Sequence, residues 1–142
     1  MKVLIDTNIL MDYVLERLPF YENSRKVMHF CVKNHISRCM AAHSILNMHY
    51  VLRHHMSDED RRATLLDLIK SISVVGVDHE KICNALSRPD FKDFEDCVQE
   101  ECAAAYGADY IITRNEKDFE SSRIPAITPA DFLAKFGTDK EN

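Results

Sequence analysis

The sequence predicts a single α/β domain in which helices cover both faces of a parallel sheet. Short apolar segments alternate along the chain with longer segments of helical periodicity, and the links between them are short. A parallel strand can pair with the next only after the chain has crossed back, usually through a helix, so this alternation is typical of a parallel sheet. A length of 142 residues suits one domain and is enough to bury a core.

Each predicted element has a local signal in the sequence. The predicted strands are the apolar segments 2–5, 36–40, 72–77, 110–113 and 125–127. The predicted helices are 8–17, 21–33, 44–55, 58–71, 79–87, 94–106 and a last one that begins at Pro129. Pro19 separates the first two helices, Ser57 is a typical N-cap, and proline is favoured at the first helical position. We expect one domain over residues 1–136, followed by a polar tail at 137–142.

Composition excludes several classes of protein. Hydrophobic residues make up 46% of the chain, which excludes a disordered protein. The longest apolar run is too short to span a bilayer, and Asp6 interrupts the apolar start, so we expect no membrane segment and no signal peptide. Five cysteines without CxxC spacing indicate reduced thiols and a cytoplasmic protein rather than a disulfide framework or a zinc site.

Two predicted strands end in polar tripeptides. Asp6-Thr7-Asn8 follows the first strand, and Thr113-Arg114-Asn115 follows the fourth, with Asp118 shortly after it. Asp96 lies in the first turn of the helix that precedes the fourth strand. Ligand sites of open parallel sheets form at the carboxyl ends of the strands, near the point where the strand order reverses. If the two strands are neighbours, these side chains converge on one cleft.

Several oxygen ligands in one cleft suit Mg²⁺ or Mn²⁺. Carboxylates that lie close together repel one another, and a shared cation neutralises them. Such a cation activates water for attack on phosphorus and stabilises the charge that develops there. The net charge of −5 argues against broad electrostatic binding of nucleic acid, but a bound cation supplies positive charge locally.

Four segments follow one another in a specific order over nearly the whole chain. They are Val3-Leu4-Ile5-Asp6-Thr7-Asn8-Ile9-Leu10, Asp93-Phe94-Glu95-Asp96-Cys97-Val98-Gln99, Ala104-Ala105-Tyr106-Gly107-Ala108-Asp109 and Ile111-Ile112-Thr113-Arg114-Asn115-Glu116-Lys117-Asp118-Phe119. Together they resemble the PIN domain family and, within it, the VapC-like toxin ribonucleases. The resemblance implies a three-layer α/β/α sandwich with a central parallel sheet of about five strands. It also implies an endoribonuclease that uses Mg²⁺ or Mn²⁺ to hydrolyse single-stranded RNA. Many members are toxins that an antitoxin protein silences, and many are homodimers.

The resemblance assigns the site residue by residue. Asp6, Asp96 and Asp118 match acidic positions of the family, so they are the expected catalytic residues and metal ligands. Asn47 and Asn115 stand at two further ligand positions that are often acidic. An amide oxygen still ligates a hard cation but brings no negative charge, so the affinity for metal should be lower.

Other polar residues are expected to support this site. Thr7, Asn8 and Thr113 lie beside the proposed ligands and are expected to orient them. Arg114 and Lys117 flank the cleft and are expected to bind RNA phosphates.

Alternative interpretations of these residues remain open. Two amides in place of carboxylates are consistent with a non-catalytic PIN-like module that binds RNA or a protein. A phosphatase or a phosphoacceptor domain would use Asp6 as its nucleophile, but Asn8 stands where a phosphatase usually has a second acid. Asp6 also suits a purely structural role as a turn former.

Asp96 has a structural alternative of its own. It follows Asp93, a predicted N-cap, at the spacing of a capping interaction. The apolar stripe of this helix is predicted to be Phe94, Cys97, Val98, Cys102 and Ala105. Asp96 is off that stripe, so periodicity alone places it towards solvent.

Overall fold

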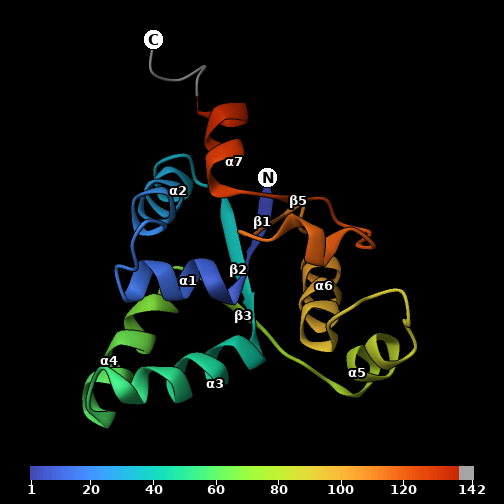
Figure 1. The fold of residues 1–142 in the computed structure, drawn as a ribbon, viewed down its shortest axis with the longest axis horizontal. Helices are drawn as coiled ribbons and strands as arrows, with labels where there is room; N and C mark the ends of the chain where they lie inside the picture. Colours follow the sequence, from blue (N-terminus) through green and yellow to red (C-terminus); the bar gives the residue numbers. More distant parts are fainter. Residues whose placement is uncertain (138–142) are drawn as a thin grey trace.

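Parallel strands form one five-stranded sheet in the computed structural model, which describes residues 1–137 (Figure 1). The strands are β1 (Lys2–Ile5), β2 (Ser37–Ala41), β3 (Ser73–Val75), β4 (Tyr110–Ile112) and β5 (Ala126–Ile127). Their order across the sheet is β3-β2-β1-β4-β5, and every neighbouring pair is parallel. The predicted parallel sheet is therefore confirmed.

Helices cover both faces of this sheet and complete the predicted α/β/α sandwich. They are α1 (Thr7–Val14), α2 (Tyr21–Lys33), α3 (Ala42–Val51), α4 (Asp58–Leu68), α5 (His79–Leu86), α6 (Phe94–Tyr106) and α7 (Pro129–Phe136), with the 3-10 turns η1 (Leu52–His54) and η2 (Glu116–Phe119). In Figure 1, α1, α2 and α4 lie on one side of the strands, and α5 and α6 lie on the other. Within residues 1–137, no helix is both long enough and apolar enough to cross a membrane.

Side chains of the strands alternate between two buried clusters. In β1, Val3 and Ile5 are fully buried in the cluster that includes residues of α1, α2, α4 and α7. Leu4 is fully buried in the opposite cluster, which includes residues of α5 and α6. Because helices cover both faces, the strands carry continuous apolar runs rather than alternating polar and apolar residues.

Some element boundaries differ from the prediction. The first predicted helix, 8–17, ends as α1 at Val14, and Glu16 adopts a φ of 51°, a left-handed conformation that cannot continue a helix. The predicted helix 44–55 divides into α3 and η1. Apart from Gly137, the tail predicted at 137–142 lies outside the described residues.

The predicted apolar stripe of α6 is only partly correct. Its three middle residues are buried, but Phe94 is 44% exposed and Ala105 is exposed. Gln99 and Glu100 are buried instead. Asp96, which periodicity places towards solvent, is half-buried. Periodicity misses Gln99 and Glu100 because their polar groups are satisfied by residues far away in the sequence.

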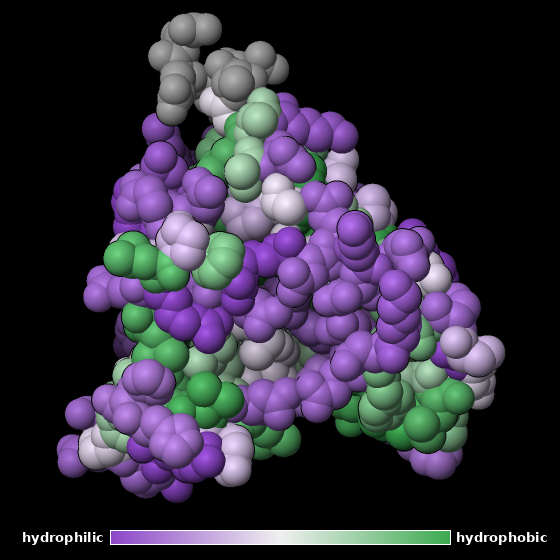
Figure 2. Space-filling view, in the orientation of Figure 1, coloured by the Kyte–Doolittle hydropathy of each residue, from purple (hydrophilic) through white to green (hydrophobic). Residues whose placement is uncertain are grey.

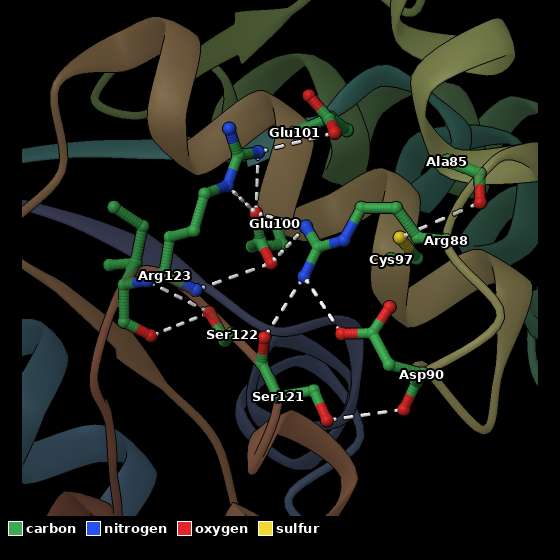
Figure 3. Close-up of polar contacts among 10 residues, drawn as sticks. Ala85, Arg88, Asp90, Cys97, Glu100, Glu101, Ser121, Ser122 and Arg123 are labelled. Carbon is green, nitrogen blue, oxygen red and sulfur yellow. Dashed lines mark hydrogen bonds and ion pairs between the residues drawn. The ribbon is translucent and has the colours of Figure 1, made fainter.

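Glu100 anchors two loops to the middle of α6 (Figure 3). Its carboxylate is fully buried, and Arg88 Nη1 donates hydrogen bonds to both of its oxygens, at 2.9 and 2.7 Å. Arg123 Nε donates to the same carboxylate. Arg88 Nη2 donates to the carbonyl of Ser121 at 2.9 Å. This network therefore joins the loop after α5 and the segment after η2 to the middle of α6.

Removing the Glu100 carboxylate should leave Arg88 without its buried partner. We expect Glu100→Ala to lower the free energy of unfolding by about 3 kcal/mol, because breaking a buried ion pair from one side leaves an uncompensated charge. Urea denaturation followed by circular dichroism measures this change. The matched control is Glu120→Ala, which removes an exposed pair with Lys92 at 3.5 Å and should cost less than ~1 kcal/mol. Equal losses in both variants would contradict the anchoring role of Glu100.

Candidate active site

The carboxylate of Asp6 lies where the strand order of the sheet reverses. Asp6 follows β1, which has β2 on one side and β4 on the other. Its backbone stands at the N-cap position of α1, but its side chain makes no capping hydrogen bond. Instead, Oδ2 accepts a hydrogen bond from Thr113 Oγ1 at 2.7 Å, and Oδ1 accepts one from Gln99 Nε2 at 2.9 Å. Asp6 is only 4% exposed, so these two donors satisfy a nearly buried carboxylate and fix its orientation.

Gln99 connects the first two acids of the site. Its Nε2 donates to Asp6 at 2.9 Å and also lies 3.4 Å from Asp96 Oδ1. Sequence analysis did not select Gln99 as a site residue, although it stands one helical turn after Asp96 and therefore on the same face of α6. That spacing was the only local signal for its role.

Asp96 lies in the first turn of α6, and its charge state depends on the acids around it. Its backbone N–H donates to the side chain of Asp93, which is the N-cap as predicted. Burial raises the pKa of Asp96 to about 7, and the charges of Asp6, Asp93 and Asp118 act in the same direction. The carboxyl group of Asp96 therefore gains or loses its proton near neutral pH.

A cleft of about 440 Å³ surrounds these acids. Six predicted site residues line it: Asp6, Thr7, Asn8, Asn47, Asp96 and Asp118. Six residues that sequence analysis did not select also line it: His43, Tyr50, Val51, Asp93, Glu95 and Gln99. The folded chain thus brings together the ends of β1, α3, α6 and η2.

Four predicted site residues lie outside the lining of this cleft: Thr113, Arg114, Asn115 and Lys117. Asn115 is exposed at the N-cap of η2, and its backbone N–H donates to Thr113 Oγ1 at 3.1 Å. Thr113 therefore bonds both to Asp6 and to the loop that carries Asp118.

Polar partners also surround the other side of the cleft. Asn47 Nδ2 donates to Glu95 Oε2 at 3.4 Å, so its amide contacts a carboxylate of α6. Thr7 Oγ1 and Ser44 Oγ share a hydrogen bond at 2.6 Å, which joins the start of α1 to α3. Burial lowers the pKa of His43, although the carboxylate of Glu95 acts in the opposite direction.

Arg114 occupies a defined place beside the cleft. Its Nε lies 2.9 Å from Asp12 Oδ2, an ion pair outside the geometry of a directed hydrogen bond. Asp12 is fully buried and also accepts a hydrogen bond from Arg17 Nε at 2.9 Å. The guanidinium of Arg114 lies over the ring of Phe20, 3.8 Å from its centroid. Asp12 and Phe20 therefore hold Arg114 in one position, whereas Lys117 is exposed.

The cleft offers oxygen ligands, although no three His, Cys, Asp or Glu side chains among residues 1–137 form a ready-made metal site. The carboxylates that line it are those of Asp6, Asp93, Glu95, Asp96 and Asp118, of which Asp6, Asp96 and Asp118 are the predicted ligands. A divalent cation would relieve the repulsion that raises the pKa of Asp96. Gln99 Oε1 is buried without a hydrogen-bond partner and is a further free oxygen. In chemical type, these residues fit a hard cation such as Mg²⁺ or Mn²⁺.

Comparison with solved structures shows the same fold in bacterial toxin–antitoxin proteins. VapBC2 of Rickettsia felis, bound to a promoter DNA fragment, is 14% identical with a TM-score of 0.67, covering 90% of this chain and 98% of its own. VapBC-1 of nontypeable Haemophilus influenzae is 20% identical with a TM-score of 0.66, covering 92% and 99%. The sarcin–ricin loop cleaving toxin VapC20 of Mycobacterium tuberculosis is 13% identical with a TM-score of 0.62, covering 77% and 86%. At these identities the likeness shows the fold alone.

Sequence comparison identifies the family. No curated protein matches the chain. The family model of the PIN domain, however, matches residues 2–117, which include β1, α6 and β4 and most of the residues that line the cleft. This match covers well over half of the chain, and the chain therefore belongs to the PIN domain family.

Proposed function

We propose that the protein is a metal-dependent endoribonuclease that hydrolyses phosphodiester bonds of single-stranded RNA. The observation that carries this proposal is the group of acids in one cleft, where the charges of Asp6 and Asp118 contribute to a pKa of about 7 for Asp96. Membership of the PIN domain family and the fold shared with a sarcin–ricin loop cleaving toxin support it.

The acids would hold the cation through oriented oxygens. Thr113 and Gln99 fix the two oxygens of Asp6, and Gln99 keeps Asp96 beside it. Asp118 lines the same cleft and supplies a further carboxylate. A bound Mg²⁺ or Mn²⁺ would supply Lewis-acid stabilisation of the charge that develops on the phosphate.

Acids of the cleft that do not bind the cation are suited to handle the proton of hydrolysis. When water attacks phosphorus, the bond to the leaving ribose oxygen breaks, and the attacking water must lose a proton. Asp93 and Glu95 line the cleft beside Asp96, and a carboxylate that is not bound to the cation would accept that proton. The leaving oxygen then takes a proton from solvent.

Positive side chains beside the cleft are the proposed contacts for RNA phosphates. Arg114 is held between Asp12 and Phe20, so its guanidinium loses little freedom when it binds an anion. Lys117 is exposed on η2, next to Asp118. These two contacts would offset, locally, the net charge of −5.

The toxin of a toxin–antitoxin pair is the proposed cellular role, with an antitoxin protein as partner. Several structures with this fold are toxin–antitoxin complexes. On α3, Leu46 is 71% exposed and Tyr50, which lines the cleft, is 62% exposed, so apolar surface adjoins the acids. Figure 2 shows a mainly hydrophilic face with apolar residues gathered at its lower right, over α5. A cytoplasmic location and a homodimer complete the proposal.

Cleavage of RNA tests the proposed activity directly. A mixed pool of single-stranded RNA should be cut by the wild-type protein with Mg²⁺ or Mn²⁺ and not with EDTA. Asp6→Asn and Asp96→Asn should lower the rate at least ~100-fold, because each removes a negatively charged oxygen ligand. Gel electrophoresis of the products measures the rate.

The control for charge alone is Asp131→Asn, which changes an exposed acid on α7 and should cleave like the wild type. Equal cleavage by all four proteins would refute the assignment of the site. Folded wild-type protein that cleaves nothing in any condition would favour the non-catalytic binding module, with Asn47 and Asn115 as the reason.

The raised pKa of Asp96 predicts how stability depends on pH. A group whose pKa is higher in the folded state binds more protons there, so without metal its contribution is present at low pH and is lost as pH rises from about 4 towards about 7. In EDTA, the wild type should lose roughly 2–4 kcal/mol of unfolding free energy between pH 5 and pH 8, relative to Asp96→Asn.

Urea denaturation at the two pH values measures this difference. Adding Mg²⁺ at pH 8 should restore stability to the wild type and not to Asp96→Asn. Parallel pH profiles for the two proteins in EDTA would show that Asp96 does not titrate in this range.

Salt dependence of RNA binding tests Arg114. In EDTA, where cleavage is absent, Arg114→Met should reduce the slope of log affinity against log salt by about 0.7, the value for one phosphate contact on a single strand. Fluorescence anisotropy of a labelled RNA measures the slope. Lys2→Met, at the amino end of β1 away from the cleft, should leave it unchanged. An unchanged slope in both variants would mean that Arg114 only stabilises Asp12.

A further inference from the structure

Arg38 is a buried cation that the chain leaves without a partner. It is the second residue of β2, next to Val3 of β1, and only 9% of it is exposed. Its Nε is buried and has no hydrogen-bond partner. In the part of the chain that the structure describes, no carboxylate forms an ion pair with its guanidinium.

Two other buried charges among residues 1–137 are each paired with arginines, whereas Arg38 has no carboxylate beside it. Asp12 has Arg17 and Arg114, and Glu100 has Arg88 and Arg123. A buried charge is costly unless an opposite charge or hydrogen bonds compensate it. An arginine cannot reduce this cost by losing its proton. An anion bound from solution would therefore compensate the charge of Arg38.

A cavity of about 540 Å³ gives such an anion access to Arg38. It lies between α1, α2 and the carboxyl end of α4, the three helices on one side of the sheet in Figure 1. Because Arg38 stands at the amino end of β2, the cavity is at the end of the sheet opposite to the acidic cleft. A smaller cavity of about 350 Å³ shares Val32, Arg38 and Ser71 with it.

Hydrogen-bond donors line this cavity together with Arg38. The hydroxyl groups come from Tyr13, Tyr21, Thr64 and Ser71, and His29 and Arg25 add two nitrogen donors. Arg25 is 45% exposed at its side chain and donates two hydrogen bonds to Glu22, so it stands at the outer part of the cavity. Val32 and Leu68 supply apolar walls.

Two carboxylates also border the cavity, and neither closes it to an anion. Asp67 has a side chain that is 81% exposed and pairs with Lys70 at 3.6 Å. Glu16 is exposed, and its carboxylate interacts with the hydroxyl of Tyr21. Both are therefore solvated groups at the edge, whereas Arg38 is the buried charge.

We propose that this cavity binds the phosphate group of a small phosphomonoester, with the guanidinium of Arg38 as the central contact. A guanidinium binds phosphate through two parallel N–H···O bonds. The hydroxyl groups of Tyr13 and Ser71 and the ring of His29 line the same cavity and can donate to the remaining phosphate oxygens. The hydroxyl groups of Thr64 and Tyr21 already contact Met56 and Glu16. The site is independent of RNA cleavage, since it shares no lining residue with the acidic cleft.

Binding of inorganic phosphate and of adenosine 5′-monophosphate tests the proposal. Both are titrated in EDTA into the full-length protein and followed by calorimetry, and the Arg38 Nε–H resonance is followed by NMR. The wild type should bind with one site, and the resonance should shift on saturation. Arg38→Met should weaken binding at least tenfold. Arg38→Lys keeps the charge but loses the two parallel N–H donors of the guanidinium, so its affinity should lie between those of the wild type and Arg38→Met.

Matched variants distinguish the outcomes. Arg62→Met removes an exposed arginine of α4 and should bind phosphate like the wild type. Without ligand, Arg38→Met should be at least as stable as the wild type, because it removes an unpaired buried charge. Tighter binding of the nucleotide than of phosphate would indicate a nucleotide as ligand, and equal binding would indicate the phosphate group alone. Undetectable binding, or equal binding by the wild type and Arg38→Met, would overturn the proposal.

Discussion

Repulsion between carboxylates at the carboxyl end of the sheet is the constraint on which much of this structure depends. Asp6 is nearly buried, and Asp96 has a pKa of about 7 because burial and neighbouring acids disfavour its charge. Thr113 from the end of β4 and Gln99 from α6 both donate to Asp6. The hydrogen bonds that stabilise this cleft therefore also join the central strand to its neighbour and to the helix behind it.

Two buried acids outside the cleft restrain neighbouring loops in the same way, by pairing with arginines. Asp12 of α1 forms ion pairs with Arg17 and Arg114, and Glu100 of α6 forms ion pairs with Arg88 and Arg123. Each acid is fully buried, and each pairs with arginines outside its own helix: Arg17 follows α1 directly, whereas Arg114, Arg88 and Arg123 come from other segments of the chain. Buried charges of this kind are costly unless fully paired, so the loops that carry the arginines are restrained to one arrangement. The loops beside the cleft are thus kept in place by charge as well as by apolar packing.

The two ends of the sheet differ in the sign of their unbalanced charge. At the carboxyl end, acids face one another and favour a cation. At the amino end, Arg38 is buried without an acid and favours an anion. The net charge of −5 is a sum over the whole chain, so it does not reveal that the two ends of the sheet differ in charge.

The sequence alone determined the elements, their parallel arrangement and the local motifs at the ends of β1 and β4, because periodicity, caps and strand-end residues are short-range signals. It also placed Asp93 correctly as the N-cap of α6. Only the tertiary structure decided which polar residues meet. Asp6 and Gln99 are 93 positions apart, and Asp6 and Thr113 are 107 apart, so no local pattern connects them. For the same reason, helical periodicity mistook Phe94 for core and missed Glu100, whose burial depends on arginines that reach α6 from distant loops.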